Sequence, residues 1–427
     1  MTRGDDIQLH TLIKEARMQQ VTINSERLWQ SLMALGKIGE QDNGGMYRPA
    51  LSPEDQQARE WLVSQMESMG LEVKVDGALN VIGRLKSQSP KTEQVVAMGS
   101  HIDTVPNGGK FDGAYGVLAA LECVKSLQEN QVTLPFDVEV ISFCDEEAAH
   151  NAGTVGSRAM MGRLLPGELE KAKIKGEKPF RYFLEQLGHS FAAVETAQRN
   201  ADEFLCFLEA HIEQGKVLES RQQSIGVVTG IVGVYRYIVT VTGEAAHAGT
   251  TPMSMRKDAL VEAAPVFTLI PQWVHEQNPD MVGTIGQVTV LPGASNVVPK
   301  ECRFLVELRS QQSQDMQVVR DKLINYANLR HGWNIETIYE KDSVVLDDHM
   351  ISCLSVVTEA AQLPYITMAS GAGHDAQSFA PSVPTGMIFI PCLAGVSHNP
   401  KEWITEEDAS NGCQVLMDAV RHLATQV

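Results

Sequence analysis

The sequence has 427 residues, of which 43% are hydrophobic and 21% are charged, and its formal net charge at pH 7 is -18. This length exceeds the usual size of a single hydrophobic core, so two domains are expected. The negative charge argues against nucleic acid as a partner, and the absence of any run of about 18 apolar residues argues against a membrane span.

Residues 1–20 are polar and contain no apolar stretch of the kind found in secretory signals. The seven cysteines are scattered, with no CxxC pair. This usage is typical of reduced, mostly buried thiols and not of a disulfide framework or a thiolate zinc site. A cytoplasmic protein is therefore expected.

The first strong pattern is a helix over 52–70, with Ser52 as its cap, Pro53 in the first turn and Gly70 as its stop. Short apolar runs follow at 94–100 and 136–144, separated by a helical pattern at 115–128. Two further buried-strand candidates have the same character, at 204–210 and 385–392. The alternation predicts an α/β fold with a largely parallel central sheet flanked by helices.

The hydrophobic pattern changes in the middle of the chain, where the expected strands alternate apolar and polar residues. The order there is a strand, a helix, two strands that can pair as a hairpin, a helix and a strand; the patterns with clear bounds are 233–243, 282–293, 301–310, 315–332 and 333–340. This is the split βαβ plan of a ferredoxin-like α+β domain. We expect residues 221–342 to form an inserted domain, and residues 1–220 and 343–427 to form one discontinuous domain.

Histidines and carboxylates gather directly after the buried runs of the first domain. In an open parallel sheet, ligands bind beyond the carboxyl ends of the strands. We therefore take these residues as site candidates: His101, Asp103, Asp145, Glu146, Glu147, His211, Glu213, Gln214 and His398.

Such a cluster of carboxylates would repel itself unless a cation were present. Imidazole and carboxylate ligands without thiolates fit zinc best, and cobalt, manganese and nickel accept the same ligand types. Taken singly, each piece has a plainer interpretation: a surface HxD pair, a solvated Glu-Glu helix start, an isolated histidine. The position of each pair directly after an apolar strand favours a metal site for the whole set.

Several motifs carry a resemblance over essentially the whole chain: "GSHIDTVPNGGKFDG", "DEEA", "EAHIEQG", "GEAAHAGTTPM", "ASNVVP", "SGAGHDAQ" and "SHNP". In this order they resemble the dinuclear-metal amidohydrolases of the peptidase M20 superfamily. Within it they are similar to the branch of allantoate amidohydrolase, N-carbamoyl-L-amino acid hydrolase and β-ureidopropionase. The resemblance implies a metallopeptidase-like catalytic domain with an inserted lid and dimerisation domain, and hence a homodimer.

The resemblance also assigns roles in a site with two divalent ions. His101 and His211 would hold one ion, Glu147 and His398 the other, and Asp112 would bridge them. Asp103 would accept the ring N–H of His101 and fix its tautomer. Glu146 would be the general base for a hydroxide shared by the two ions. Gly108 and Gly109 would let the chain turn back tightly between His101 and Asp112.

Further roles concern the substrate. By resemblance, His247 would stabilise the oxyanion, in its own active site or in that of the partner subunit; the alternative is a loop histidine beside a turn. Gln214 would contact the substrate near the metals, and Asn296 with Arg309 would bind its carboxylate. A salt-bridged strand arginine is the alternative for Arg309. The loop containing Gly373 and His374 would line the pocket and not add ligands.

One loop departs from the family pattern. The branch usually has Glu-Glu-Gly-x-Arg-Phe after the third strand, whereas this chain has "EEAAHNAG", with Ala148, His150 and Asn151 at the glycine, arginine and phenylalanine places. Hydrolysis of a ureido bond in an N-carbamoyl-L-amino acid or an allantoate-like carboxylate is the first expectation. The alternatives are hydrolysis of another N-acyl amino acid or amide and, from a different class, a non-catalytic metal-binding protein.

Overall fold

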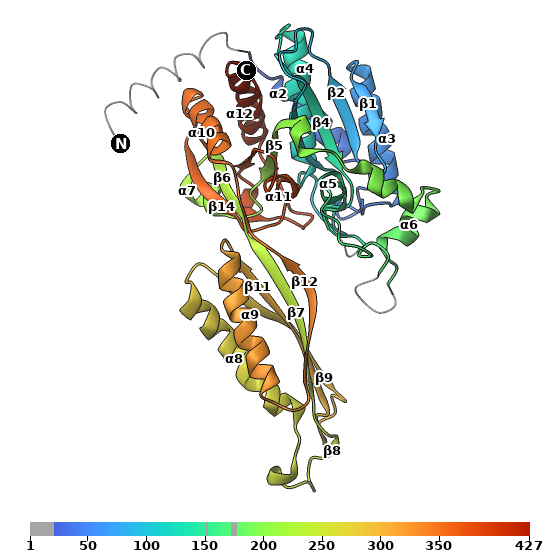
Figure 1. Cartoon of the computed structure of the whole chain (residues 1–427), viewed down its shortest axis with the longest axis vertical. Helices are drawn as coiled ribbons and strands as arrows, with labels where there is room; N and C mark the ends of the chain where they lie inside the picture. The colour runs from blue at the N-terminus through green and yellow to red at the C-terminus, as the bar shows by residue number, and fades with distance from the viewer. Residues whose placement is uncertain (1–20, 151–152, 172–176) are drawn as a thin grey trace, which may run out of the picture. The chain divides into compact units, whose positions relative to one another are not determined.

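The computed structural model describes residues 21–150, 153–171 and 177–427. Contacts divide the chain into two compact units (Figure 1). The first unit comprises the chain up to Thr229 together with Val345–Val427, and the second is Gly230–Val344. Among the described residues, no helix combines the length and the apolar character needed to cross a membrane.

The first unit is built on a nine-stranded sheet whose centre is parallel. Its strand order is β1-β2-β4-β3-β5-β15-β6-β13, and β14 also pairs with β6. Strands β4, β3, β5 and β15 pair in parallel, whereas the pairs β1–β2, β2–β4 and β6–β15 are antiparallel. The bounds are β1 Glu72–Val75, β2 Val81–Leu85, β3 Val95–His101, β4 Asp137–Phe143, β5 Phe204–Ile212, β6 Ile225–Ile231, β13 Val344–Val345, β14 Tyr365–Ser370 and β15 Thr385–Ile390.

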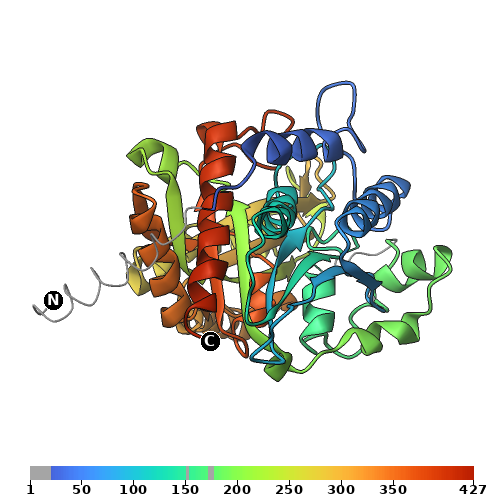
Figure 2. The ribbon, with the colours of Figure 1, turned by 90° about the horizontal axis from the view of Figure 1, so that it is seen from above.

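Helices cover the central strands, and this explains why these strands are continuous apolar runs instead of alternating ones. A large hydrophobic cluster joins the sheet to five helices: α2 Ser25–Leu35, α3 Pro53–Ser68, α4 Ala114–Glu129, α10 Asp348–Ala360 and α12 Glu406–Ala424. Helices α2, α4 and α12 lie side by side (Figure 2). A smaller cluster involves α5 Val155–Met160, α6 Phe180–Gln186 and η1 Phe191–Ala197.

Helix α3 begins and ends where its sequence predicts. The Ser52 side chain accepts a hydrogen bond from the backbone N–H of Asp55, and Pro53 occupies the first turn, where no N–H is needed. Gly70 follows the helix with φ +75°, a backbone conformation that suits glycine. The predicted α/β class, with a mostly parallel central sheet flanked by helices, is confirmed.

The second unit has an antiparallel sheet in the order β12-β7-β11-β9, with two helices against it. The bounds are β7 Gly233–Thr242, α8 Ala259–Gln277, β9 Val282–Leu291, β11 Glu301–Ser310, α9 Ser313–Asn328 and β12 Trp333–Lys341. A separate two-stranded sheet pairs β8 Ala246–His247 with β10 Val297–Val298. The order of the main elements is the predicted split βαβ plan.

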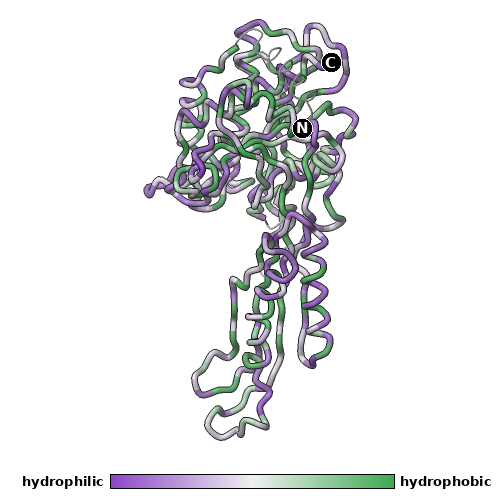
Figure 3. Tube along the Cα trace, turned by 90° about the vertical axis from the view of Figure 1, so that its left-hand side faces the viewer, coloured by the Kyte–Doolittle hydropathy of each residue, from purple (hydrophilic) through white to green (hydrophobic). Residues whose placement is uncertain are grey.

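One face of this smaller sheet is covered by the helices. Tyr237, Val239 and Val241 of β7 are fully buried, whereas the residues between them are not. Hydrophobic and hydrophilic stretches alternate along the strands and helices of this unit (Figure 3). Alternation with period two places every second side chain in the core, and it accounts for the alternating apolar and polar residues of this part of the sequence.

Candidate metal centre

Three histidines from separate segments approach one carboxylate, that of Asp112, in the loop before α4. His101 ends β3 and His211 lies near the end of β5. The Nε2 atom of His211 is 3.2 Å from Asp112 Oδ1, and that of His101 is 3.7 Å from the same oxygen. The side chains of His101, His211 and Asp112 are buried.

The second oxygen of Asp112 faces another pair of candidate ligands. The Nε2 atom of His398 is 3.2 Å from Asp112 Oδ2 and 3.1 Å from Glu147 Oε1. Asp112 therefore lies between two groups, each of which has ligand atoms close enough together to hold one ion: His101 and His211 on one side, and Glu147 and His398 on the other.

The hydrogen bonds of the two buried rings fit a cation. His101 Nδ1 is 3.0 Å from the backbone carbonyl of Asp103, and His211 Nδ1 is 2.9 Å from the carbonyl of Ile212. Because a carbonyl only accepts, Nδ1 carries the hydrogen in each ring, and the lone pair of Nε2 faces Asp112. A lone pair and a carboxylate repel each other unless a proton or a metal ion lies between them, so the donor set fits a divalent ion.

The electrostatics of the cluster agree with this interpretation. Hydrogen bonds with Asp112 and Glu147 raise the pKa of His398 to about 11. Burial disfavours the charged ring of His211, but the hydrogen bond with Asp112 and the negative charges of Asp112 and Glu209 together outweigh burial and raise its pKa to about 9. The surroundings of His211 and His398 therefore favour positive charge beside Asp112, and a metal ion that bound there would displace protons from these rings.

Glu146 lies beside the first group. Its Oε2 atom is 3.8 Å from His101 Nε2, and its side chain is mostly buried. The Asp103 carboxylate accepts hydrogen bonds from the backbone N–H groups of Glu146 and Glu147, at 3.3 and 3.2 Å. Asp103 therefore touches His101 through its backbone carbonyl, and it holds the turn that carries both glutamates through its side chain.

Unusual backbone conformations cluster at the ends of these strands. Asp145, Gln214 and His398 have φ values of +53°, +58° and +53°. Non-glycine residues in this region cost of the order of 1–3 kcal/mol each and persist where the surrounding structure over-determines them. The sequence gives no sign of this strain, because none of the three positions is a glycine.

Two side chains that the sequence analysis did not select support Asp112. The Ser397 hydroxyl is 2.8 Å from Asp112 Oδ2 and 3.0 Å from Glu402 Oε2. Glu402 Oε1 accepts hydrogen bonds from the backbone N–H groups of Phe111 and Asp112. A Cβ atom at Gly109 would collide with the Glu402 carboxylate, which explains this glycine. A glutamate four residues after His398 carries no sequence signal that it is buried.

With this geometry established, comparison with known proteins decides the family. The family model described as "Peptidase family M20/M25/M40" matches residues 97–422. The chain belongs to this family. The resemblance seen in the motifs is thereby confirmed. Membership implies divalent metal ions, and the two groups around Asp112 offer candidate ligands for them.

The relatives of this chain indicate which branch of the M20 family it resembles. An N-carbamoyl-L-amino acid amidohydrolase from Geobacillus stearothermophilus is 38% identical over 94% of this chain and 99% of its own length. An allantoate amidohydrolase from Escherichia coli is 34% identical over 95% and 100%. A hydantoinase/carbamoylase family amidase from Burkholderia multivorans has a TM-score of 0.81 at 33% identity, covering 94% of this chain and 98% of its own.

The predicted pocket residues of this M20 chain differ in their surroundings. The Gln214 side-chain amide donates to Asp112 Oδ2 at 2.7 Å, and its buried Oε1 atom has no hydrogen-bond partner among the described residues. His374 is buried, its ring centroid is 4.5 Å from that of His211, and its Nε2 atom is 2.8 Å from the Ser370 hydroxyl. Gly373 is exposed. Their roles toward substrate stay predictions.

His247, Asn296 and Arg309 belong to the second unit. His247 is exposed on the two-stranded sheet, and the backbone carbonyl of Asn296 accepts a hydrogen bond from the adjacent Ala248 N–H at 2.9 Å. The fold thus brings His247 and Asn296 together. Arg309 Nε donates to Glu307 Oε1 at 2.7 Å, which is the strand ion pair considered as an alternative for this residue.

The departing loop contributes to packing. The His150 ring stacks on Phe183 with centroids 4.0 Å apart, and its Nε2 atom is 2.8 Å from the backbone carbonyl of Ala50. His150 therefore lies against the smaller hydrophobic cluster, which contains Ala50 and Phe180. Asn151 lies outside the described residues.

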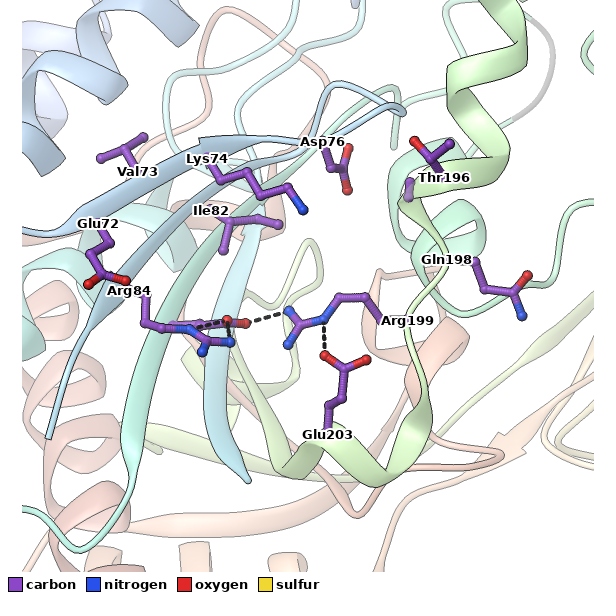
Figure 4. A pocket seen from close by; sticks show the side chains of 12 residues that line it. Glu72, Val73, Lys74, Asp76, Ile82, Arg84, Thr196, Gln198, Arg199 and Glu203 are labelled. Carbon is purple, nitrogen blue, oxygen red and sulfur yellow. Dashed lines mark hydrogen bonds and ion pairs between the residues drawn. The ribbon is translucent and has the colours of Figure 1, made fainter. Parts of the chain in front are cut away.

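A cavity of about 540 Å³ lies elsewhere in the first unit, along β1 and β2 (Figure 4). None of the candidate metal ligands lines it. The buried Glu139 carboxylate accepts from both Arg84 and Arg199, and Arg199 also pairs with Glu203. These ion pairs join β2, β4 and the segment before β5, which is a structural role. Because the candidate metal ligands lie outside this cavity, we assign the chemistry to the Asp112 cluster.

Proposed function

We propose that this M20 chain hydrolyses the ureido C–N bond of an N-carbamoyl-L-amino acid or of an allantoate-like ureido carboxylate. The observation that carries the proposal is the Asp112 carboxylate between two groups of candidate ligands, with Glu146 beside them. Relatives over nearly the whole chain are named for these two substrate classes, which favours them over other amides.

We propose two divalent ions per chain, with zinc first and manganese, cobalt or nickel as alternatives. His101 and His211 would hold one ion, Glu147 and His398 the other, with Asp112 shared. Bound divalent ions supply Lewis acidity, which polarises a carbonyl and acidifies water.

Glu146 is the proposed general base. It takes a proton from the water that attacks the ureido carbon and delivers that proton to the nitrogen as the C–N bond breaks. The backbone of Glu146 is fixed by the Asp103 carboxylate, so its side chain approaches from a constrained turn. His247 would stabilise the oxyanion, and Asn296 and Arg309 would bind the substrate carboxylate, to which a guanidinium offers two parallel donors.

The pocket near Asp112 would involve Gln214 and the Gly373–His374 loop. The Gln214 amide donates a hydrogen bond to Asp112, so it lies close enough to the proposed metal centre to contact a substrate bound there. Its unpartnered Oε1 atom offers an acceptor for an N–H group of the substrate.

We also propose a homodimer formed through the second unit. Strand β9 ends the order of its four-stranded sheet, and it exposes apolar side chains that water would not favour, among them Val282, Val288 and Leu291. Light scattering should give a dimer for the wild type and a monomer for Val288→Lys. A monomeric wild type would contradict the proposal.

A cytoplasmic location is proposed as well, and the seven unpaired, buried cysteines support it.

A substrate panel tests the reaction. Metal-loaded protein is incubated with allantoate, N-carbamoyl-L-amino acids, N-acetyl amino acids and aromatic N-acyl amino acids, and ammonia and free amino acid are measured. Release of ammonia from a ureido compound is the expected result. Cleavage of simple N-acyl amides alone, without ammonia, would favour the alternative hydrolase, and metal binding without any turnover would favour a binding protein.

A further inference from the structure

Arg48 is a fully buried arginine close to the candidate metal centre. It lies at 0% exposure between the end of α2 and the exit of β3. Burying a guanidinium is expensive, and apolar residues of similar volume are often as stable in such places. Stability alone therefore gives a weak reason for an arginine here.

The contacts of Arg48 are with the backbone. Its Nε atom donates to the carbonyl of Ile102 at 2.6 Å, and Nη1 donates to the carbonyls of Ile38 at 2.6 Å and Leu35 at 3.2 Å. Its backbone N–H donates to the Thr104 hydroxyl at 3.0 Å, and its backbone carbonyl accepts from Thr104 N–H at 2.9 Å. The segment after β3 is thus fastened on both sides of Asp103.

Ile102 is the residue between His101 and Asp103, so its carbonyl sets the direction of both neighbours. The Asp103 carbonyl receives the ring N–H of His101, and the Asp103 carboxylate receives the N–H groups of Glu146 and Glu147. A shift of this short segment would therefore move a candidate ligand and the turn with the two glutamates together. Second-layer contacts of this kind control metal affinity.

The charge of the guanidinium is compensated locally. Three carbonyl oxygens accept its hydrogen bonds, and the Asp55 and Asp103 carboxylates act on it electrostatically. Burial lowers the pKa of Arg48 to about 10, which leaves the side chain charged at neutral pH. An uncharged replacement would leave buried carbonyls without donors.

We propose that Arg48 is a positioning residue of the metal centre: by holding the Ile102 carbonyl, it keeps His101 and Asp103 aimed at the ions and at the Glu146–Glu147 turn. The inference rests on the proposed function, because it presumes that the Asp112 cluster binds divalent ions. It concerns a residue that contacts neither the candidate ligands' side chains nor a substrate.

The test uses full-length Arg48→Met, Arg48→Lys and Thr104→Val, with Leu323→Ala in the core of the second unit as a control that disturbs packing away from the site. Affinity for Zn²⁺ is measured by competition with a chelator of known affinity, and kcat is measured at saturating metal. Arg48→Met should weaken metal binding by about 10–100-fold and lower kcat. Arg48→Lys keeps the charge but donates from a single nitrogen, so it should recover part of the affinity. Leu323→Ala should lower thermal stability but keep the wild-type affinity within about twofold.

Wild-type affinity and kcat in a folded Arg48→Met protein would make Arg48 a purely structural residue and overturn the inference. If that variant does not fold, Arg48→Lys, whose single ammonium nitrogen cannot replace both Nε and Nη1, decides on the same two readouts, and Thr104→Val separates the part played by the Arg48 backbone N–H. A wild type that binds no divalent ion would overturn the proposed function and this inference together. A wild type that binds Zn²⁺ no more tightly than Arg48→Met does would overturn the inference alone.

Discussion

Asp112 shows how much chemistry can depend on one carboxylate. Against the opposing effect of burial, His211 and His398 hold the pKa of Asp112 well below its ordinary value. Gln214 and Ser397 also approach its Oδ2 atom. Burying the charge of a carboxylate is costly unless the charge is compensated, and a cation bound between Asp112 and the histidines would compensate it. We therefore take the cluster as the centre of the site.

The first prediction concerns Glu146. Glu146→Gln keeps the volume of the side chain and its backbone contact with Asp103, but it cannot take a proton. Turnover of the ureido substrate should fall by about two to four orders of magnitude, while the metal content per chain, measured by elemental analysis, stays at the wild-type value. Glu195→Gln, at an exposed position, is the matched control. Unchanged turnover in Glu146→Gln would remove it from the role of base.

The second prediction concerns Gly109. An added Cβ would meet the buried Glu402 carboxylate, which cannot move without losing the N–H groups of Phe111 and Asp112. Gly109→Ala should therefore lower the free energy of unfolding by about 1–3 kcal/mol. Gly371→Ala is the control, because a Cβ there has no neighbour within 4 Å. Urea unfolding followed by circular dichroism measures both, and equal midpoints for the two variants would show that the Glu402 contact is unimportant.

Residues differ in how far the sequence alone reveals them. His101, Glu147, His211 and His398 follow from polar residues after apolar strands, whereas Asp112 follows from the family resemblance. The structure places all five together. Arg48, Ser397 and Glu402 could not be found in this way. Each acts through burial and through hydrogen bonds to backbone groups that are distant in sequence, and neither feature leaves a local pattern.

At the scale of elements, local chemistry was a good guide to helices and strands but not to the turns between them. Helix α3 follows from its cap, its proline and its glycine, and the buried runs became central strands. The turns after the strands use left-handed backbone at Asp145, Gln214 and His398. Nothing in a single sequence distinguishes these residues from ordinary ones, because tertiary contacts impose the conformation.

The third prediction concerns two tyrosines of β7. The Tyr235 hydroxyl donates to Asp342 at 2.6 Å, and the Tyr237 hydroxyl donates to Glu340. Burial and the hydrogen bond to Asp342 raise the pKa of Tyr235 to about 12, and burial with Glu340 raises that of Tyr237 further. In the unfolded chain a tyrosine has a pKa of about 10.

Because the folded pKa values are raised, the stability that Tyr235 contributes is fully present below about pH 10 and is lost as the pH rises through about 12, and that of Tyr237 is lost only at still higher pH. The second unit should therefore unfold more easily between these values. Tyrosinate absorbance at 295 nm should show late titration in the wild type, and one late-titrating group fewer in Tyr237→Phe. Ordinary titration of all eight tyrosines near pH 10 while the protein remains folded would contradict this assignment.

At the scale of the whole molecule, the two units have separate hydrophobic cores that share no residues. The first unit contains the large cluster with Val117 and Leu416, and the second contains the cluster with Val239 and Leu323. The change from buried runs to alternating strands predicts two kinds of sheet. It could not show which strands pair at the centre of the larger sheet, because pairing is decided by contacts that are distant in sequence.

The last prediction follows from where the candidate ligands lie. All five belong to the first unit, and they come from both of its segments: His101, Asp112, Glu147 and His211 from the earlier one and His398 from the later one. Bound ions would tie the two segments together and stabilise the folded first unit, by about 2.7 kcal/mol for one site at a metal concentration 100 times Kd. The core of the second unit contains none of these ligands, so it should gain nothing.

Differential scanning calorimetry can separate the two effects. Removing metal with a chelator should lower the transition of the first unit and leave that of the second in place, and restoring Zn²⁺ should reverse the change. Glu146→Gln should keep the full metal-dependent shift, since the base is not a proposed ligand, whereas Asp112→Asn should lose most of it because both ions share this carboxylate. Equal shifts of both transitions, or the same shift in Asp112→Asn as in the wild type, would mean that the stabilising metal binds somewhere other than the Asp112 cluster.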